Sequence, residues 1–363
     1  MYRYRHDSTS ESSDNENHLS LNPIKTFDLS YTLLNAEDVR KHIDEFENSG
    51  ERKCEYIDTV LLIHNSLEMV PFNVSKFNNL KRLDISNNHI TSLPDFICSL
   101  PLSCLIAKNN RITNEGLPKS FRNFRNLKVI NLSGNNLSRF PEQCLENDSV
   151  EFLYLGSNNI IDLPKEIDRL YRLKILCLGG NYLTEIPSTV GSLDNLQGLI
   201  LSDNALETLP SSIANLKNLK SLLLHKNRLR MLPTEIIALK CLTELSLREN
   251  PLVVNFVSDM QHNPPSLLEL SGRTIKLHNI EIPEGELPAT LEQYLKSAHR
   301  CVNPKCKGVF FDNRVEHIKF VDFCGKYRVP LLQYLCSSKC VVNNAALQGS
   351  YTDNAMMRKV LLG

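Results

Sequence analysis

Apolar residues recur through the middle of the chain in a repeating unit. Residues 173–193, for example, are LKILCLGGNYLTEIPSTVGSL. The alternation of apolar and other residues at the start of this unit predicts a short β-strand with one buried face. The Ile-Pro pair that follows predicts the start of a short helix or an extended segment, because proline fixes φ and lacks an amide hydrogen. Each unit therefore predicts a strand, a turn and a return segment.

An asparagine follows the strand of every unit and fixes the register of the repeat. These asparagines are Asn65, Asn88, Asn110, Asn135, Asn158, Asn181, Asn204, Asn227 and Asn250. The frame Leu-x-x-Leu-x-Leu-x-x-Asn-x-Leu is typical of leucine-rich repeats, and it predicts an α/β solenoid of nine repeats with a curved parallel sheet on the concave face. The asparagine amides are expected to satisfy backbone groups as a ladder. The longest spacing, 25 residues between Asn110 and Asn135, predicts a bulge on the convex side or its approach.

The segments outside the repeats divide the rest of the chain. Residues 1–22 are polar and rich in Ser, Asp and Asn, so they are predicted to be disordered. Asn35 is a suitable N-cap, with Asp38 at the third helical position and Gly50 as a stop, which predicts a helix that caps the array. The predicted domains are a disordered N-terminus (1–22), an N-terminal helical cap (23–56), the leucine-rich repeat domain (57–255), two helices (256–299), a cysteine-rich module (300–345) and a tail (346–363).

The concave strands carry a row of apolar side chains. One apolar residue occupies the same strand position in each of four consecutive repeats: Tyr154, Cys177, Ile200 and Leu223. Single exposed apolar residues are ordinary, but a continuous apolar patch often marks a binding site. We therefore predict that a protein target binds along this row, with His225 and Arg248 in its polar rim.

The composition limits the classes of partner. The 363 residues include 41 Lys and Arg and 41 Asp and Glu, so the formal net charge is zero. This balance argues against a surface for nucleic acid or for an anionic membrane. The N-terminus has no apolar signal-peptide core, and no apolar run approaches the roughly 18 residues of a membrane span. We therefore expect a cytoplasmic location, with the nucleus as an additional one, where thiols stay reduced.

Cysteines cluster near the C-terminus in two pairs with the spacings Cys-x4-Cys and Cys-x3-Cys. The pairs are Cys301 with Cys306 and Cys336 with Cys340. Four thiolates on two tight turns suit a tetrahedral zinc ion, so we predict a structural zinc site. Cys324 and His317 are alternative ligands, and a module of reduced, unligated cysteines is the alternative interpretation. The alternating residues 315–323 between the pairs predict a β-strand.

Two short apolar helices are predicted between the repeats and the cysteines. Pro264-Pro265-Ser266 is typical of a helix start. One face of the first helix then carries a stripe made of Leu267, Leu270, Ser271, Thr274 and Ile275. Gly272 inside this helix costs roughly 1 kcal/mol relative to Ala, so it is either tolerated or allows a neighbour to approach closely.

The first helix resembles the BC box, in which a Ser/Thr/Pro-Leu pair is followed by a small residue four positions on and an aliphatic residue four beyond. Ser266, Leu267, Ser271 and Ile275 match that pattern, and Leu270 lies on the same face. The resemblance implies that this helix binds in an apolar groove of elongin C, with Leu267 as the anchor.

The second helix resembles a cullin box. Leu287-Pro288, Leu291 and Leu295 match the cullin-2 box, and Pro288, Leu291, Tyr294 and Leu295 equally match the end of the cullin-5 box. The cullin-5 pattern has a further Leu-Pro pair where this chain has Gly285-Glu286. Two alternatives remain: the helices simply cap the array and cover its surface, or residues 330–336, PLLQYLC, which resemble the start of a suppressor-of-cytokine-signalling box, bind elongin instead.

The whole chain resembles the leucine-rich repeat-containing protein 58 family and, more distantly, the leucine-rich repeat substrate receptors of elongin B/C–cullin ubiquitin ligases. The resemblance is carried by the repeats, by SLLELSGRTIKLHNI, LPATLEQYL, CVNPKCKGVFF and HIKFVDFCGKYRVPLLQYLC, and by the final KVLLG. It implies a non-enzymatic subunit that holds a protein target on the concave face for ubiquitination and proteasomal degradation, while elongin B/C, cullin-2 or cullin-5 and a RING protein complete the ligase. The sequence has no Gly-rich phosphate loop, GxSxG or HExxH motif. The alternative is a non-catalytic scaffold or signalling adaptor.

Overall fold

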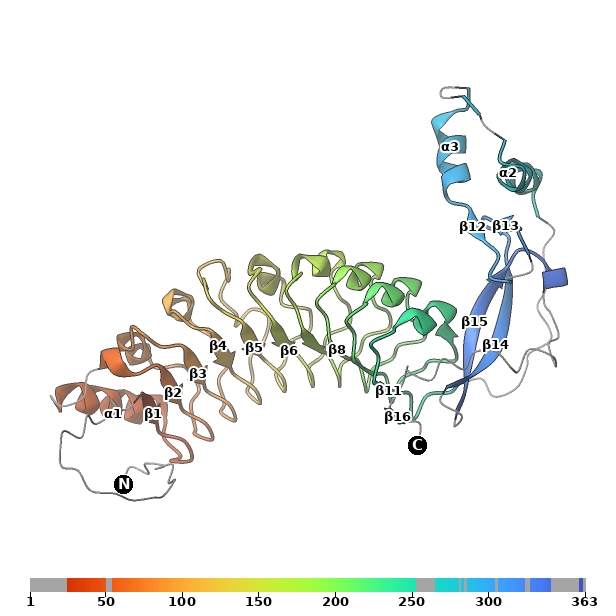
Figure 1. Cartoon of the computed structure of the whole chain (residues 1–363). Coiled ribbons are helices and arrows are strands. Elements are labelled where there is room, and N and C mark those ends of the chain that lie inside the picture. Colours follow the sequence, from red (N-terminus) through yellow and green to blue (C-terminus); the bar gives the residue numbers. More distant parts are fainter. Residues whose placement is uncertain are drawn as a thin grey trace, which may run out of the picture. The chain divides into compact units, whose positions relative to one another are not determined.

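The computed structural model describes residues 25–49, 54–252, 265–280, 282–283, 286–303, 306–323, 327–340 and 359–361, with the backbone alone for 319–323, 327–328 and 359–361. These residues belong to two compact units, Met1–Asn204 and Ala205–Gly363. Figure 1 labels strands and helices of both units. The predicted disordered segment 1–22 lies outside the described residues, as do Gly50, residues 256–264 and most of the predicted tail 346–363.

The first unit is built on a parallel sheet in which consecutive strands are neighbours. Its strands are β1 (Thr26–Asp28), β2 (Thr59–Leu61), β3 (Arg82–Asp84), β4 (Cys104–Ile106), β5 (Val129–Asn131), β6 (Phe152–Tyr154), β7 (Ile175–Cys177) and β8 (Gly198–Ile200). Each strand pairs with the next in the same register, so that the central residue of β3, Leu83, lies beside Leu105 of β4. Both central side chains are buried, as the alternation in the sequence predicts.

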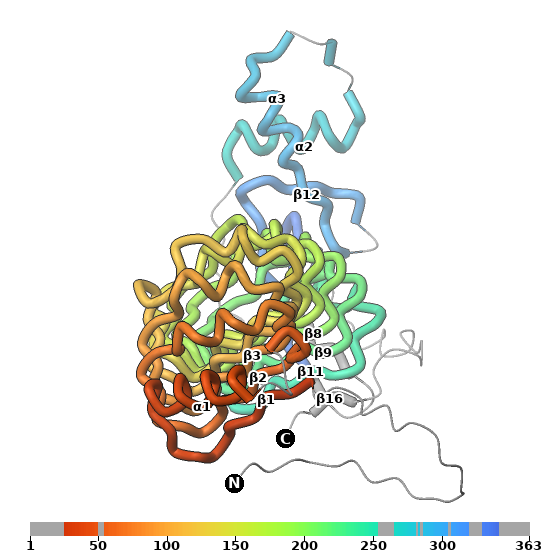
Figure 2. The backbone as a smooth tube through the Cα atoms, turned by 90° about the vertical axis from the view of Figure 1, so that its left-hand side faces the viewer, coloured from red at the N-terminus to blue at the C-terminus, as the bar shows by residue number. Residues whose placement is uncertain are grey.

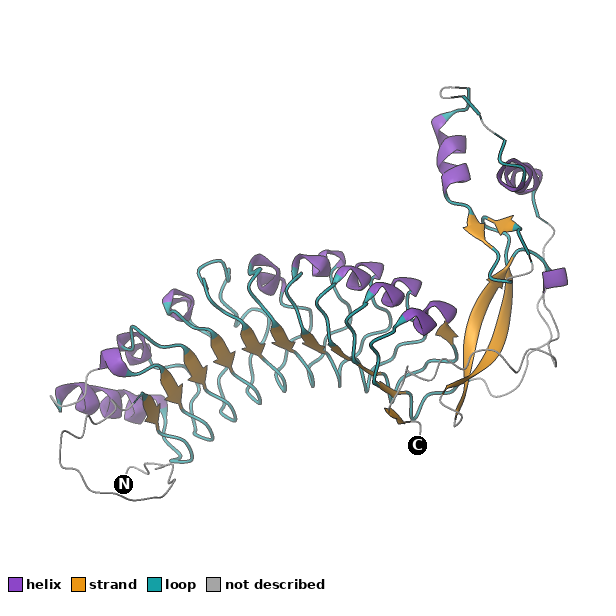
Figure 3. Cartoon of the chain, viewed as in Figure 1, coloured by secondary structure: helices purple, strands orange, loops and turns teal. Residues whose placement is uncertain are grey.

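Short 3-10 helices return the chain on the side opposite to the strands of the first unit (Figure 3). They are η1 (Cys54–Tyr56), η2 (Phe72–Lys76), η3 (Asp95–Ser99), η4 (Glu142–Glu146), η5 (Lys165–Arg169) and η6 (Ser188–Ser192). From η2 to η6 an extended proline precedes the helix, as Pro164 does with φ −65° and ψ 146°. Of the two predicted outcomes after each proline, a short helix or an extended segment, these repeats show the short helix.

The repeat with the longest spacing departs from this pattern. Among its described residues it has a turn at 114–117 and no 3-10 helix. Gly116 lies so close to Thr91 that a Cβ atom at this position would be 2.2 Å from the Thr91 carbonyl oxygen. Phe121 and Phe124 are buried beyond the turn, with their rings edge to face and centroids 5.3 Å apart. The extra residues therefore form a local turn ahead of the return segment, as predicted.

The repeated asparagines form the predicted ladder. Asn158 Oδ1 accepts a hydrogen bond from the backbone N–H of Leu137 at 3.1 Å. Its Nδ2 donates to the carbonyl oxygens of Leu132 and Leu155, both at 3.0 Å. Asn158 is only 5% exposed, so these bonds satisfy backbone groups that water does not reach. This requirement explains why an amide side chain recurs at one position of every repeat.

The N-terminal end of the first unit combines a predicted helix with a strand that the sequence pattern does not predict. Helix α1 (Ala36–Asn48) begins after Asn35, whose side chain accepts hydrogen bonds from the backbone N–H groups of Glu37 and Asp38 at 2.9 and 3.0 Å. Val39 and Ile43 on its inner face are buried. The unpredicted strand is β1, which lies beside α1 (Figure 2) and pairs in parallel with β2.

The second unit contains the last two repeat strands, β9 (Ser221–Leu223) and β11 (Glu244–Ser246), which are parallel neighbours. The helices η7 (Ser211–Asn215) and η8 (Thr234–Ala238) are the return segments of this unit. A C-terminal strand, β16 (Lys359–Leu361), pairs in parallel with the other edge of β11. Residues near the C-terminus of the chain thus cover the last repeat strand.

A separate β module follows the repeats. Strands β14 (Val315–Phe323) and β15 (Tyr327–Leu335) form an antiparallel hairpin, and β10 (Leu232–Pro233) adds to β15 in parallel. The predicted strand at 315–323 is confirmed. The segment that resembles the start of a suppressor-of-cytokine-signalling box lies in β15 and the residue after it, so it forms a strand rather than a helix. The shorter strands β12 (His299–Arg300) and β13 (Val309–Phe310) form a second antiparallel pair.

Candidate functional site

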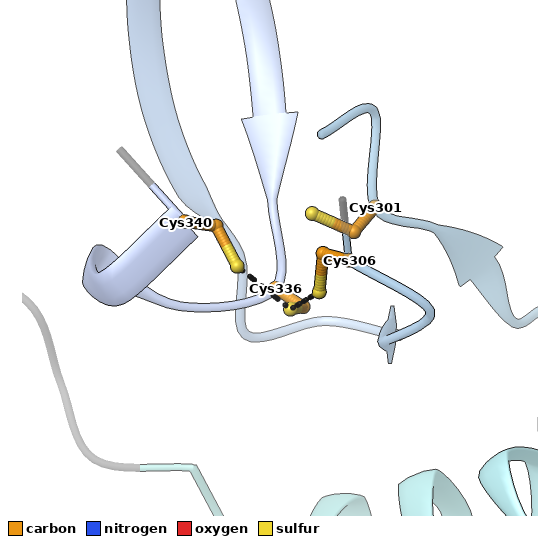
Figure 4. Close-up of side chains that lie close together, drawn as sticks. All are labelled: Cys301, Cys306, Cys336 and Cys340. Atoms are coloured by element: carbon orange, nitrogen blue, oxygen red, sulfur yellow. Dashed lines mark hydrogen bonds between the residues drawn. The ribbon is translucent and has the colours of Figure 1, made fainter. Parts of the chain in front are cut away.

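The β module brings the four paired cysteines together (Figure 4). Cys301 follows β12 and Cys306 precedes β13, whereas Cys336 follows β15 and Cys340 ends the short helix η9 (Ser338–Cys340). Their four Sγ atoms all lie within 4.8 Å of one another. The distances from the sulfur of Cys336 to the sulfurs of Cys306 and Cys340 are both 3.5 Å. The hairpin β14–β15 thus closes the sequence gap between the two pairs.

The cluster fits a metal ion held by four sulfur atoms. Sulfur separations of 3.5 Å are much longer than the roughly 2.05 Å of a disulfide. They are close to the roughly 3.8 Å edge of a tetrahedron with metal–sulfur bonds of about 2.3 Å. Gly308 donates its backbone N–H to Cys306 Sγ at 3.3 Å, and a Cβ on Gly308 would lie only 2.7 Å from Cys336 Sγ. The cluster could therefore hold a metal, and a glycine is required beside it.

The surroundings of the cluster affect the protonation of its thiols. Burial raises the pKa of the Cys336 and Cys306 thiols, because the protein interior disfavours thiolate charge without a nearby cation. A bound cation would reverse this preference and release protons. His317, an alternative ligand in the sequence, is not part of the four-cysteine group, and Cys324 lies outside the described residues.

Helix α2 (Leu267–Leu277) carries the BC-box pattern on an exposed face. Ser266 caps the helix by accepting a hydrogen bond from the backbone N–H of Glu269 at 3.1 Å. Leu267 is 83% exposed and Leu270 is 45% exposed. Ser271 is exposed and Ile275 is half-buried. Most of the residues predicted to bind elongin therefore form an accessible stripe on this helix.

The opposite face of α2 packs against the β module. Glu269 is 2% exposed, and its carboxylate accepts hydrogen bonds from the backbone N–H groups of Phe311 at 3.1 Å and Asn313 at 2.8 Å. Arg273 pairs with the same carboxylate. A Cβ on Gly272 would lie 3.0 Å from the Phe311 ring, so Gly272 is where a neighbour approaches closely. Sequence reasoning did not single out Glu269, Arg273 or Phe311.

Helix α3 (Ala289–Lys296) carries the residues of the predicted cullin box. Pro288 precedes the helix and is exposed, whereas Leu287, Leu291 and Leu295 are half-buried. The ring of Tyr294 stacks on Phe311, with centroids 4.4 Å apart and an angle of 12° between the planes. One face of Tyr294 is therefore already used within the chain, and its role in cullin binding remains a prediction.

The apolar row of the first unit is half-buried and wider than predicted. Tyr154, Cys177 and Ile200 lie side by side on β6, β7 and β8. Burial raises the pKa of the Tyr154 hydroxyl, as expected for a ring packed among apolar neighbours. A second row, missed by the sequence reasoning, starts with Phe152 beside Ile175. The first residue of each strand could have revealed this second row, because it points to the same face of the sheet as the third residue.

The remaining residues of the predicted target site belong to the second unit. Leu223 and His225 are half-buried and Arg248 is exposed. Leu223 pairs with Ser246 of β11. Within the described part of this unit, His225 Nδ1 and Ser246 Oγ are buried atoms without a hydrogen-bond partner. A continuous surface across both units remains a prediction.

The unit of strand, ladder asparagine and proline-started return segment defines a leucine-rich repeat protein, a class that suits protein–protein interaction and is generally non-enzymatic. Family models described as "Leucine-rich repeat region" and "Leucine Rich Repeat" match residues 155–271 and residues 79–100 and 126–147, respectively. The chain belongs to the leucine-rich repeat-containing protein 58 family. In the part that the structure describes, no helix has the length and apolar character needed to cross a membrane.

Members of this family match most of the chain. Leucine-rich repeat-containing protein 58 of Xenopus laevis is 58% identical over 344 residues, which cover 92% of this chain and 97% of the relative. The Homo sapiens protein of that name is 62% identical over 302 residues, 81% of each chain.

Among solved structures, a leucine-rich repeat protein of Leptospira interrogans is 29% identical to this chain and has a TM-score of 0.41. The match covers 55% of this chain and 62% of the Leptospira chain.

Proposed function

We propose that this protein is the substrate-recognition subunit of an elongin B/C–cullin RING ubiquitin ligase. The observation that carries the proposal is the orientation of α2. Its Glu269 and Gly272 side is buried against the β module, and the stripe that resembles a BC box faces outward. The exposed face of α2 is therefore the face that carries the motif. An amphipathic helix that matched the motif by chance could equally have buried that face.

The exposure of Leu267 supports a partner at this position. Burying a leucine side chain contributes about 1.5–3 kcal/mol relative to leaving it in water, and Leu267 is 83% exposed in the isolated chain. A groove of elongin C would bury Leu267 and Leu270, while the small Ser271 lets the partner approach the backbone. This arrangement is helix-in-groove recognition.

The rest of the ligase follows in sequence order. Pro288, Leu291 and Leu295 would contact cullin-2 or cullin-5, and a RING protein on the cullin would supply the ubiquitin transfer. The half-buried rows around Tyr154 and Ile200 would hold the protein target. A single structural zinc ion in the four-cysteine cluster would stabilise the β module, as zinc does in sites of this ligand set. The proposed location is the cytoplasm, with the nucleus as an additional site.

The test is co-purification of elongin B/C with the full-length chain. Leu267→Ala combined with Ser271→Phe should abolish it, because losing a buried leucine anchor costs about 2–5 kcal/mol and each 1.4 kcal/mol is tenfold in affinity. Leu277→Ala is the matched control. Leu277 is 50% exposed on the same helix but lies outside the BC-box pattern, so this variant should retain elongin.

Two further outcomes separate this proposal from a plain scaffold or signalling adaptor. If the unaltered chain never retains elongin B/C, the ligase assignment is wrong and the scaffold takes its place. If elongin is retained, Pro288→Ala with Leu291→Ala should keep elongin and lose the cullin. Tyr154→Ala should weaken capture of the target proteins without affecting either ligase partner, because truncating a buried aromatic anchor costs about 2 kcal/mol or more.

A further inference from the structure

A buried ion pair connects α2 to the four-cysteine cluster. Charged side chains are almost never fully buried unless they are paired. The side chain of Glu269 is only 2% exposed, and it forms an ion pair with Arg273, whose side chain is 18% exposed. Arg273 Nη1 donates a hydrogen bond to the carbonyl oxygen of Cys336 at 2.8 Å. Arg273 also donates to the carbonyl oxygen of Asn313 and to the Glu269 carboxylate. One guanidinium thus joins the helix to a residue of the cluster and to the loop after β13.

The carboxylate of Glu269 reaches the other half of the cluster. It accepts from the backbone N–H groups of Phe311 and Asn313, which follow Cys306 and Gly308 closely in sequence. Gly308 in turn donates its backbone N–H to Cys306 Sγ at 3.3 Å, and a Cβ atom added to it would lie 2.7 Å from Cys336 Sγ. The position of the segment from Cys306 to Asn313 therefore depends on how the cluster is held, and so does the position of the atoms that bind Glu269.

Among the described residues, helix α2 is held mainly by its contacts with the β module. It contains 11 residues, and isolated helices shorter than roughly 12–15 residues are marginal in water. On its outer face Leu267, Leu270, Ser271 and Leu277 are exposed and Ile275 is half-buried. Among the described residues, only Glu269 and Gly272 of this helix are buried. The helix therefore depends on the contacts with the β module for both its fold and its orientation.

We propose that Glu269 and Arg273 are a positioning pair that couples α2 to the four-cysteine cluster, so that the BC-box face is presented only while the cysteines are held together by a bound metal ion. The coupling is local to the second unit. Losing the metal releases the Cys336 carbonyl and the loop after β13, and α2 then loses the acceptors and donors that fix it. The consequence for elongin rests on the proposed function, whereas the coupling itself does not.

Hydrogen exchange of the full-length chain tests the coupling. The metal is removed with a strong zinc chelator and restored with zinc alone, and the metal content is measured at each step. Removal should speed exchange in residues 267–277 by at least about tenfold, and zinc should reverse the change. Residues 175–200 of the first unit should exchange at an unchanged rate. Unchanged exchange in 267–277 after the metal has left, or a chain that never holds stoichiometric metal, would overturn the proposal.

Variants separate the positioning pair from the cluster. Glu269→Gln replaces an acceptor with a donor that faces backbone N–H groups, so exchange in α2 should rise by at least about tenfold while the metal content stays at one per chain. Arg273→Lys keeps the charge but loses the planar fork that binds several acceptors, and it should have the same effect. Glu316→Gln is the matched control, because Glu316 is 45% exposed and pairs with Arg314 in the same module at 3.9 Å.

The outcomes distinguish this proposal from the proposed function. If elongin is never retained but α2 exchange follows the metal, the coupling stands and the ligase assignment fails. If elongin is retained equally with and without metal, and α2 exchange does not change, the coupling fails and the ligase assignment stands. A Glu269→Gln variant with the exchange rate of the unaltered chain would also overturn the role of the pair.

Discussion

Phe311 offers a quantitative test of how the two appended helices are held. Its side chain is 4% exposed, its ring stacks on Tyr294 of α3, and it lies against Gly272 of α2. Replacing a buried phenylalanine with alanine costs about 3–5 kcal/mol. The net free energy of unfolding of a folded protein is only about 0.05–0.15 kcal/mol per residue. The loss caused by Phe311→Ala is therefore a large part of the stability of a small module, and this variant should unfold it. Phe311→Leu keeps most of the buried apolar area and loses the ring stacking, which contributes about 0.5–1.5 kcal/mol.

The leucine variant is therefore the informative one. It should keep its metal and retain elongin through α2, but exchange in residues 289–296 should rise by about threefold to tenfold, because α3 has lost its stacked partner. Cullin binding should weaken in parallel. Hydrogen exchange and co-purification of the two partners measure both effects. The reasoning is refuted if Phe311→Leu speeds exchange in the repeats rather than in α3, or if α3 exchanges at the rate of the unaltered chain.

Three further predictions concern the ladder, the cluster and pH. Asn181→Ala removes the ladder hydrogen bonds of a side chain that is 6% exposed. Because unpaired buried polar groups cost about 1–3 kcal/mol each, it should lower the free energy of unfolding of the repeats by about 2–4 kcal/mol in urea. Asn195→Ala removes one exposed bond and should cost less than about 1 kcal/mol. Gly308→Ala should lose stoichiometric metal by elemental analysis, because the added Cβ would lie 2.7 and 3.1 Å from two cluster sulfur atoms. Burial alone would raise the pKa of Glu269, but its hydrogen bonds outweigh burial and lower the pKa below its ordinary value. The carboxylate therefore stabilises α2 above the unfolded-state pKa of about 4.3, and this contribution is lost as pH falls through the folded-state pKa. The acid unfolding of α2 is compared between the unaltered chain and Glu269→Gln, and the additional loss of stability in the unaltered chain measures the contribution of the carboxylate. Identical acid transitions in the two proteins would contradict this prediction.

The sequence by itself determined the repeats. An Asn at one position of each unit and alternating apolar residues permit a single register, because a shift by one residue would expose the leucines and leave backbone groups unpaired. The same local logic predicted the Asn35 cap, the helix starts after proline and the strand at 315–323. It also placed four cysteines in two close pairs, and the chemistry of four thiols was enough to suggest a metal site. The second row of the concave face was missed only because a single strand position was considered.

Only the tertiary structure decided which face of α2 is buried. In the sequence, Glu269 and Arg273 are an ordinary pair four residues apart, which on a helix surface contributes about 0.2–0.5 kcal/mol. The fold buries that pair against the loop after β13 and the carbonyl of Cys336, and this contact leaves Leu267 outside. Helical periodicity places residues on a face but does not say which face finds a neighbour. That choice depends on backbone N–H and carbonyl groups from distant segments, whose positions are set by the cysteine cluster and the hairpin that brings its two halves together.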